Sequence, residues 1–394
     1  MRVSLRPETA QYGHVLRPLW QLDPYIAPIN HGSFGATPIE ILEEQTHWQG
    51  VMEKNPARFF MQDLPRELRR TAAEIAPYFG TSPGRFAFVE NATSGTTAVL
   101  RSLEFAPGDE ILTTDHVYNA VRNTISFIAI RTGAVSIEVP MPAPLQHGAE
   151  ATEVILAAMS PRTRLVVLDH ISSTSTATFP VKQIVAACHS RGVPVLIDGA
   201  HGPGLLDLDI DDIGADWYVG NCHKWLCAPK GAAFIVVSER PTSLVHPLAI
   251  SHAYGQGFVA EFDKTGTRDA SPWLCIPAAI RFHERLGGKS MRQRNKKLAL
   301  RVAQAMTQET GMTAACAPEL CQSMVALKLP VDRVPTREDI GSIHDFLYDH
   351  HRFETAITIL RGAVYLRISV HAYNEASDFD GLAKAAMAAA EALV

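Results

Sequence analysis

The sequence predicts an α/β protein with a large domain, built on a mainly parallel sheet, and a smaller C-terminal α+β domain. Through the first two thirds of the chain, short apolar runs alternate with amphipathic segments. This pattern is typical of parallel strands that helices cover on both faces. The last third instead begins with a long helical pattern and then carries two separate strand patterns. A chain of 394 residues has room for both domains.

Taken in order, the expected strands of the large domain are residues 86–89, 110–113, 164–168, 193–198, 217–219 and 231–237. A helix is expected after the loop at residues 90–95, because Val99, Leu100 and Leu103 recur at a spacing that makes one buried face. A further helix over residues 181–191 is expected to end at Gly192.

The prolines and the change of pattern near Pro272 predict the domain boundaries. Residues 1–30 contain Pro7, Pro18, Pro24 and Pro28, and we expect an arm with some helix that packs with the small domain. The large domain is then 31–272 and the small C-terminal domain 273–394. In the small domain we expect a helix through residues 278–282, strands near 324–327 and 364–368, and an Ala-rich helix over 379–394.

Composition excludes several classes of partner. A hydrophobic content of 46% and a charged content of 20% suit a soluble globular protein, and a net charge of −5 gives no attraction for nucleic acid or an anionic membrane. No apolar stretch approaches the ~18 residues of a membrane span, and the N-terminus resembles no secretory signal. Free thiols in a cytoplasmic protein are the simplest account of six cysteines without a C-x-x-C pair. Cys222, His223 and Cys227 fit no common zinc spacing, so we expect no metal.

Asp198 and Lys224 are the strongest candidates for chemistry. Asp198 ends an apolar run, and Lys224 follows the next expected strand about 26 residues later. Ligands of open α/β sheets bind at the carboxyl ends of strands. A lysine there can form a Schiff base with the aldehyde of pyridoxal 5'-phosphate (PLP), and a carboxylate can keep the pyridine nitrogen protonated. A capping carboxylate and a solvated lysine are the ordinary alternatives, but the apolar neighbours Trp225 and Leu226 favour a buried lysine with a lowered pKa.

The loop at residues 91–95 is a candidate phosphate site. Its small residues let backbone N–H groups approach an anion, and the helix that begins there adds its positive end. Thr93 and Ser94 add hydroxyl groups. An ordinary helix N-cap is the alternative interpretation of this loop.

Together these motifs resemble the class V aminotransferase family of PLP enzymes. The similar segments occur in family order: Asn91-Ala92-Thr93, Asp115-His116-Val117-Tyr118, Asp169-His170-Ile171-Ser172-Ser173, Asp198-Gly199-Ala200-His201, Asn221-Cys222-His223-Lys224-Trp225, Thr265-Gly266-Thr267-Arg268-Asp269 and Arg367-Ile368-Ser369. Within the family, the chain is most similar to the isopenicillin N epimerase-like branch, which includes carbon–sulfur lyases. The resemblance implies the PLP-dependent transferase fold type I and PLP as the cofactor.

The resemblance also implies roles for single residues around the cofactor ring. Lys224 is expected to carry the cofactor and to move protons, Asp198 to pair with the pyridine nitrogen, and His201 to lie near O3′. Tyr118 is expected to stack on the ring, with His116 as the alternative and a core tyrosine as the ordinary interpretation.

Further implied contacts concern the phosphate and the substrate. The matching phosphate positions are Ala92, Thr93, Asn221 and His223, and Thr267 would reach the phosphate of the neighbouring subunit in a homodimer with shared active sites. Ser173 stands where some relatives have an asparagine near O3′, a departure that leaves its contact open. Arg367 matches the arginine that clamps the α-carboxylate of an amino-acid substrate, a contact that suits a planar guanidinium.

The resemblance implies a reaction at Cα and Cβ of an α-amino acid through an external aldimine and a quinonoid. Cysteine desulfurases of the family use a cysteine about 15 residues before the clamping arginine, and residues 351–355 contain none. The expected activity is therefore that of a Cβ–S lyase acting on an S-substituted cysteine, since it needs Lys224 alone as base. An epimerase, which needs a second acid, and a transaminase remain alternatives. A binding protein without activity would have no need of the Asp198–Lys224 pair. The substrate pocket is expected to draw on the N-terminal arm and on residues 55–62 and 252–257.

Overall fold

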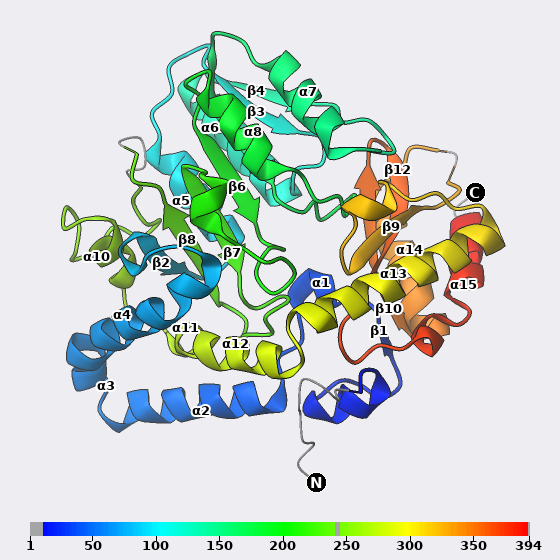
Figure 1. The fold of residues 1–394 in the computed structure, drawn as a ribbon, viewed down its shortest axis with the longest axis horizontal. Helices are drawn as coiled ribbons and strands as arrows, with labels where there is room; N and C mark the ends of the chain where they lie inside the picture. Colours follow the sequence, from blue (N-terminus) through cyan, green and yellow to red (C-terminus); the bar gives the residue numbers. More distant parts are fainter. Residues whose placement is uncertain (1–10, 241–244, 332, 393–394) are drawn as a thin grey trace.

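The computed structural model describes residues 11–240, 245–331 and 333–392 (Figure 1). Its main element is a seven-stranded sheet with the order β2-β8-β7-β6-β5-β3-β4. The strands are β2 (Phe86–Val89), β3 (Glu110–Thr114), β4 (Val135–Val139), β5 (Thr163–Asp169), β6 (Val195–Gly199), β7 (Trp217–Asn221) and β8 (Ala233–Val237). Pairing is parallel from β4 through β7, and β8 is antiparallel to both β7 and β2. The predicted mainly parallel sheet is confirmed.

Helices cover both faces of this sheet because its strands alternate apolar side chains between two buried clusters. On β5, Leu165 and Val167 face one cluster, whereas Val166 and Leu168 face the other. The first cluster includes α5 (Ala92–Ser102), α6 (Asn119–Thr132) and α10 (Phe258–Asp263). The second includes α4 (Leu64–Ile75), α7 (Gly148–Ala158), α8 (Val181–His189) and α9 (Ile210–Ile213). The remaining helices of this part are α1 (His31–Phe34), α2 (Ile39–Lys54), α3 (Pro56–Arg58) and α11 (Ser271–Leu274).

The C-terminal part is a smaller α+β arrangement, as predicted. An antiparallel sheet in the order β11-β12-β9 contains β9 (Met324–Lys328), β11 (Ala356–Leu360) and β12 (Ala363–Ser369). Its helices are α12 (Ile276–Arg285), α13 (Lys289–Thr310), α14 (Arg337–His351) and α15 (Leu382–Glu391). In the described part of the chain, none of the helices has both the length and the apolar composition that a membrane span requires.

The N-terminal segment joins the C-terminal part. Strand β1 (Ala27–Pro28) pairs in parallel with β10 (Phe353–Glu354), and the amide of Ser369 on β12 donates to the carbonyl of Ile29. A short 3-10 helix (His14–Leu19) precedes β1. The expected arm with some helix agrees with this path from residue 11 onward, while the first ten residues of that expectation lie outside the described chain. The domain boundaries at 30 and 272 stay predictions.

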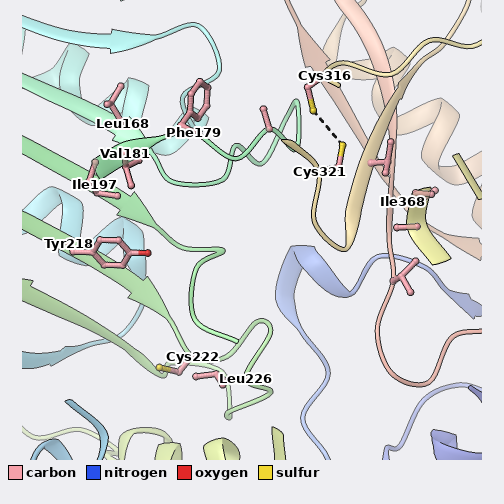
Figure 2. Close-up of a cluster of buried hydrophobic side chains, with 14 of the residues drawn as sticks. Leu168, Phe179, Val181, Ile197, Tyr218, Cys222, Leu226, Cys316, Cys321 and Ile368 are labelled. Carbon is pink, nitrogen blue, oxygen red and sulfur yellow. Dashed lines mark hydrogen bonds between the residues drawn. The ribbon is translucent and has the colours of Figure 1, made fainter. Parts of the chain in front are cut away.

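One buried cluster runs from the large sheet into the small one (Figure 2). Ile197 and Tyr218 lie in it on the large sheet, and Ile368 lies in it on β12. Cys316 and Cys321 lie at the junction, with their Sγ atoms 3.5 Å apart. Protein cores are close-packed and resist displacement of their side chains. The shared cluster therefore holds β12 in a fixed position relative to the carboxyl ends of β5 and β6.

Candidate active site

The candidate site lies where the strand order of the large sheet reverses. Strand β3 leads outward to β4, whereas β5 leads to β6 and β7 in the opposite direction. Open α/β sheets bind ligands at the carboxyl ends of the strands at such a point. A cavity of about 330 Å³ lies there, within the size range of small-molecule sites. Its lining includes many of the residues that the sequence nominated: Ala92, Thr93, Tyr118, Ser173, Asp198, His201, Asn221, His223 and Lys224.

Lys224 is a buried amine beside a histidine of defined tautomer. Its Nζ lies 3.2 Å from Nε2 of His201, and Nε1 of Trp225 lies 3.2 Å from Nδ1 of the same ring. Because an indole N–H can only donate, Nδ1 of His201 accepts, and the neutral ring carries its proton on Nε2, facing Lys224. Burial, and after it the charge of Arg367, lowers the pKa of Lys224 to about 8. Burial also holds the pKa of His201 well below its usual range. The amine is therefore available as a nucleophile and base near neutral pH.

Asp198 is a buried carboxyl on β6. It is 3% exposed, and its Oδ1 accepts a hydrogen bond of 2.9 Å from the amide of Ala200. Burial raises its pKa, while that amide and the charge of Lys224 act in the opposite direction. A carboxyl placed at a strand end, inside a cavity that also holds an amine, suits a ligand that brings its own positive charge.

The other end of the cavity can hold an anion. Asn91 caps the eleven-residue helix α5 by accepting from the amide of Ser94 at 2.9 Å, and Thr93 lies in the first turn. Oδ1 of Asn221 accepts from the amide of Ala92 at 2.8 Å, which ties the helix start to β7. The positive end of a helix favours phosphate. Nδ1 of His223 donates to the carbonyl of Ala232 at 3.2 Å, and burial lowers the pKa of this ring to about 4, so in the neutral ring Nε2 can only accept. A hydrogen bond from this ring to a phosphate therefore requires protonation of Nε2.

Arg367 is a buried guanidinium surrounded by neutral oxygens. Its NH1 donates to the carbonyl and the hydroxyl of Ser173 at 2.8 and 2.9 Å. Its NH2 donates to Oδ1 of Asn30 at 3.2 Å and to Oγ of Ser33 at 2.7 Å, and the buried Nε has no partner among the described atoms. Burial lowers its pKa to about 10, so the side chain keeps its charge at neutral pH. Such a cation has room for an anionic ligand.

Glycine brings the helix that carries Ser33 close to Lys224. Gly35 has a φ of 70°, and a Cβ there would lie 2.1 Å from the carbonyl oxygen of His223 and 2.6 Å from that of Lys224. A side chain at Gly35 would therefore push α1 away from the cavity. The close approach explains how Ser33 and Phe34 come to line it.

The structure separates the two candidates for the stacking position. Tyr118 lines the cavity and is 44% exposed. His116 is enclosed in protein, with its Nδ1 2.8 Å from Oγ of Ser175. Only Tyr118 of these two is placed to meet a bound ring.

Other expected site residues lie apart from this cavity. Thr267 is exposed, and it lines two other cavities instead. The expectation that residues 55–62 and 252–257 contribute to the substrate pocket stays a prediction, because within one chain they do not line this cavity. Phe60, Met61, His252 and Gln256 line a separate cavity of about 850 Å³ with Thr267. The structure brings these two segments together, which no sequence pattern predicted.

A buried Cys–His–His cluster, not expected from spacing, lies behind the lysine. Sγ of Cys227 is 3.7 Å from Nε2 of His31 and 3.6 Å from Nε2 of His371. Nε2 of His31 is also 3.1 Å from the carbonyl of Lys224, which can only accept, so this nitrogen carries a proton and offers no lone pair. The two imidazole rings stack 3.9 Å apart at 15°. A metal ion lies close to the plane of each imidazole ring that binds it. Because the planes of these two stacked rings are almost parallel, one ion cannot lie in both planes. The cluster therefore supports the Lys224 backbone and is a poor zinc site.

Three residues of the site stand in segments that resemble the family but received no role from the sequence. Asp169 ends β5 inside the cavity, and its position directly after an apolar run was a signal of the same kind as that of Asp198. Asn30 and Ser33 hold Arg367, but no local pattern links them to a residue more than 330 positions later.

Comparison with known proteins gives a consistent result. The family model "Aminotransferase class-V" matches residues 39–382. The chain is 33% identical over 393 residues to putative L-cysteine desulfhydrase 1 of Oryza sativa, covering 91% of this chain and 82% of that protein. It is 32% identical over 384 residues to isopenicillin N epimerase of Amycolatopsis lactamdurans, covering 92% and 95%. Among solved structures, the complex of a cystine C–S lyase with cysteine persulfide has a TM-score of 0.75 at 23% identity, covering 92% of this chain and 97% of that one.

These findings agree with the arrangement of the cavity. A buried amine, a strand-end carboxyl and a helix start are the groups that a PLP-binding pocket requires, and the predicted fold type I is confirmed. The chain belongs to the class V aminotransferase family, and it is a PLP-dependent enzyme.

Proposed function

We propose that the protein is a Cβ–S lyase that carries out β-elimination on an S-substituted cysteine. The net reaction consumes one water and releases a thiol, pyruvate and ammonium. Relatives named L-cysteine desulfhydrase share 30% and 33% identity with this chain. Relatives named isopenicillin N epimerase share 31% and 32%, so sequence identity alone does not separate the two activities.

PLP supplies an aldehyde that condenses with amines and a ring that accepts the electron pair released at Cα. We propose that Lys224 holds the cofactor and, once freed by the substrate amine, removes the proton from Cα. The Nε2–H of His201 directs a hydrogen bond at this amine and favours its neutral form. Asp198 would hold the positive ring nitrogen, which is the state that draws electrons from Cα.

The remaining contacts orient the cofactor and the substrate. The phosphate would lie at the start of α5, where Ala92 and Thr93 line the cavity with Asn221 and His223. The hydrogen bond between Ala92 and Asn221 holds this helix start in place. Tyr118 would cover one face of the ring and exclude water from it. The contact of Ser173 with the cofactor, left open by the sequence, gains an alternative, because its hydroxyl and carbonyl both bind Arg367.

We propose that Arg367 binds the α-carboxylate of the substrate. Its unpartnered Nε–H and its charge favour an anion over a neutral group. A carboxylate held there, with the substrate amine at Lys224, directs the Cα–H bond toward the base.

The observation that carries the lyase assignment is the amine of Lys224, the less exposed of the two lysines that line the cavity. Lys224 can take the Cα proton and return it to the leaving sulfur, so elimination needs no second acid. The cysteine nucleophile that a desulfurase requires is also missing from the residues lining this cavity in the described chain. An epimerase would need a proton donor on the face opposite Lys224, and the exposed side chains of Tyr118 and Lys230 are cavity residues available for that role.

We further propose a homodimer that completes the site. The exposed Thr267 and the apolar cavity lined by Met61 and His252 would then face the neighbouring subunit. A cytoplasmic location, in which six free cysteines stay reduced, also remains a prediction. Sedimentation would test the dimer, and a monomer that retains full activity would exclude shared sites.

Product analysis in deuterated water tests the reaction. Purified holoenzyme is incubated with a panel of S-substituted L-cysteines and with L-amino acids that lack a β-leaving group. Pyruvate and thiol in equal amounts are expected from the cysteine derivatives. Deuterium at Cα with inverted configuration, without pyruvate, would instead establish an epimerase. Conversion of added 2-oxo acids to amino acids would establish a transaminase.

A further inference from the structure

We propose that Asp169 and Asp198 form a carboxyl pair that carries one negative charge, with Asp169 as the protonated member. Asp169 then acts as a positioning residue for the cofactor. It donates its proton toward Asp198 and thereby limits how strongly that carboxylate attracts the ring nitrogen. The proposal concerns the cofactor end of the cavity and is independent of whether elimination or epimerisation follows.

Strand register places the two carboxyl groups side by side. β5 and β6 pair in parallel with Asp169 opposite Asp198. Side chains alternate along a strand, so Asp169 lies on the same face as Leu165 and Val167, and Asp198 on the same face as Leu196. All three apolar residues belong to the same buried cluster. Neighbouring strands lie about 4.8 Å apart, so the two carboxyl groups are immediate neighbours.

Both groups are withdrawn from water, with exposures of 4% for Asp169 and 3% for Asp198, and both line the cavity. Two carboxylates in such a setting repel each other strongly, and a shared proton is the usual resolution. Oδ2 of Asp169 is buried without a hydrogen-bond partner among the described atoms. A carboxylate oxygen in that state would be costly, whereas a protonated oxygen can donate to its neighbour.

The surroundings assign the proton to Asp169. Asp198 accepts from the amide of Ala200, which favours its ionised form. Asp169 receives the amide of Tyr118, but burial and then the charge of Asp198 raise its pKa well above the usual range, and Arg122 and Lys224 oppose this.

A neighbouring hydroxyl does not replace the missing partner. Tyr218 belongs to the cluster on the opposite face of the sheet, and its hydroxyl lies 3.0 Å from Nδ1 of His170. Because the amide of Tyr118 contacts Asp169, the same side chain also fixes the backbone where the proposed stacking residue begins α6. A neutral carboxyl at position 169 therefore contacts both Asp198, which is proposed to hold the ring nitrogen, and the backbone of Tyr118, which is proposed to stack on the ring.

Infrared difference spectroscopy tests the protonation directly. The carbonyl stretch of a protonated carboxyl is compared between the wild type and Asp169→Asn, in both apo-protein and holoenzyme at neutral pH. Wild type is expected to show this band, and Asp169→Asn is expected to lack it. Asp216→Asn is the matched control, because the buried Asp216 accepts from the amide of Val195 at 2.8 Å and lies 3.4 Å from Nε of Arg240, and the band should remain. Absence of the band from the wild type, or its persistence in Asp169→Asn, would overturn the assignment.

Two further measurements separate a neutral Asp169 from a charged one. Asp169→Asn exchanges one neutral side chain for another, so PLP affinity at neutral pH should stay within about threefold of wild type. A loss of affinity as large as that of Asp198→Asn would refute the proposal.

Stability against pH gives the second measurement. Since a raised folded pKa means that the native state retains a proton which the unfolded chain releases, wild-type apo-protein loses stability as pH rises toward that pKa. The Tm of Asp169→Asn minus the Tm of wild type should therefore increase as pH rises. A constant difference would show that Asp169 is ionised throughout. None of these readouts depends on product identity, so a failed lyase assay leaves the proposal standing.

Discussion

Replacement of Arg367 by alanine should weaken substrate binding while leaving the cofactor in place. The guanidinium lies on β12, is fully enclosed, and makes four hydrogen bonds to Asn30, Ser33 and Ser173. None of these three partners is an anion. The positive charge lies directly behind Ser33 and Ser173, which line the cavity, and is thus available to a substrate carboxylate that reaches past them.

The expected magnitude follows from the donors that remain. Of the five N–H groups of an arginine, four are engaged here and only the one on Nε lacks a partner. An incoming carboxylate therefore gains one new charged hydrogen bond and exchanges a second with a neutral oxygen such as that of Ser33. At ~1.5–3 kcal/mol for a charged bond, the net loss on removal is about 2–4 kcal/mol. This corresponds to a rise in KM of roughly 30- to 900-fold.

The assay measures KM and kcat for the best cysteine conjugate, together with PLP content and Tm. Arg367→Lys keeps the charge but not the planar fork, so it should recover part of the loss. Ser33→Ala removes a single partner and should change KM far less. Arg294→Ala is a control for general damage, because Arg294 binds the carbonyls of His371 and Asn374 outside the cavity. A KM within about twofold of wild type in Arg367→Ala with full PLP content would refute the reasoning.

Three other perturbations and one pH profile complete the tests. Lys224→Ala should abolish turnover and prevent borohydride from linking PLP to the protein; retained activity would end the assignment of this residue. Asp198→Asn should weaken PLP affinity about tenfold or more, since one charged contact is lost, and equal affinity measured by titration would contradict its role. Trp225→Phe removes the donor that fixes the His201 tautomer, so kcat should fall several-fold, and an unchanged kcat would show that the tautomer does not matter. The rate at which apo-protein captures PLP should rise with pH around a midpoint near 8, because only the deprotonated amine reacts, and a flat profile would exclude the lowered lysine pKa.

Much of the fold was predictable because it depends on local patterns. The run that ends at Asp198 is a strand that is buried on both faces, so its apolar character is continuous and its end is visible. Strand β11 was missed because Ala356–Leu360 is short and only half-buried, and its antiparallel pairing with β12 depends on a tight turn at Arg361. The Ala-rich helix begins at Leu382, later than expected, since a 3-10 turn over Ala376–Phe379 precedes it.

The site was predictable where residues act through their chemistry and unpredictable where they act through long-range contact. Lys224 carries its own signal, because the apolar Trp225 and Leu226 follow it directly and a lysine is seldom buried without a function. The choice between Tyr118 and His116 depends on which side of one loop faces the cavity, and spacing does not reveal it. The support of Arg367 by Asn30 requires the first and last parts of the chain to meet, and no window of sequence contains both.

Arg367 is synthesised well after the residues that line the cavity. Residues that line the cofactor cavity end at Gly231, and Arg367 follows 136 residues later (367 − 231). At ~5–20 residues per second, a ribosome adds these residues in roughly 7–27 seconds. During this interval the nascent chain already contains Lys224, Asp169 and Asp198, but the arginine proposed to bind the substrate carboxylate is not yet made. The residues proposed to hold the cofactor are therefore made before the residue proposed to hold the substrate.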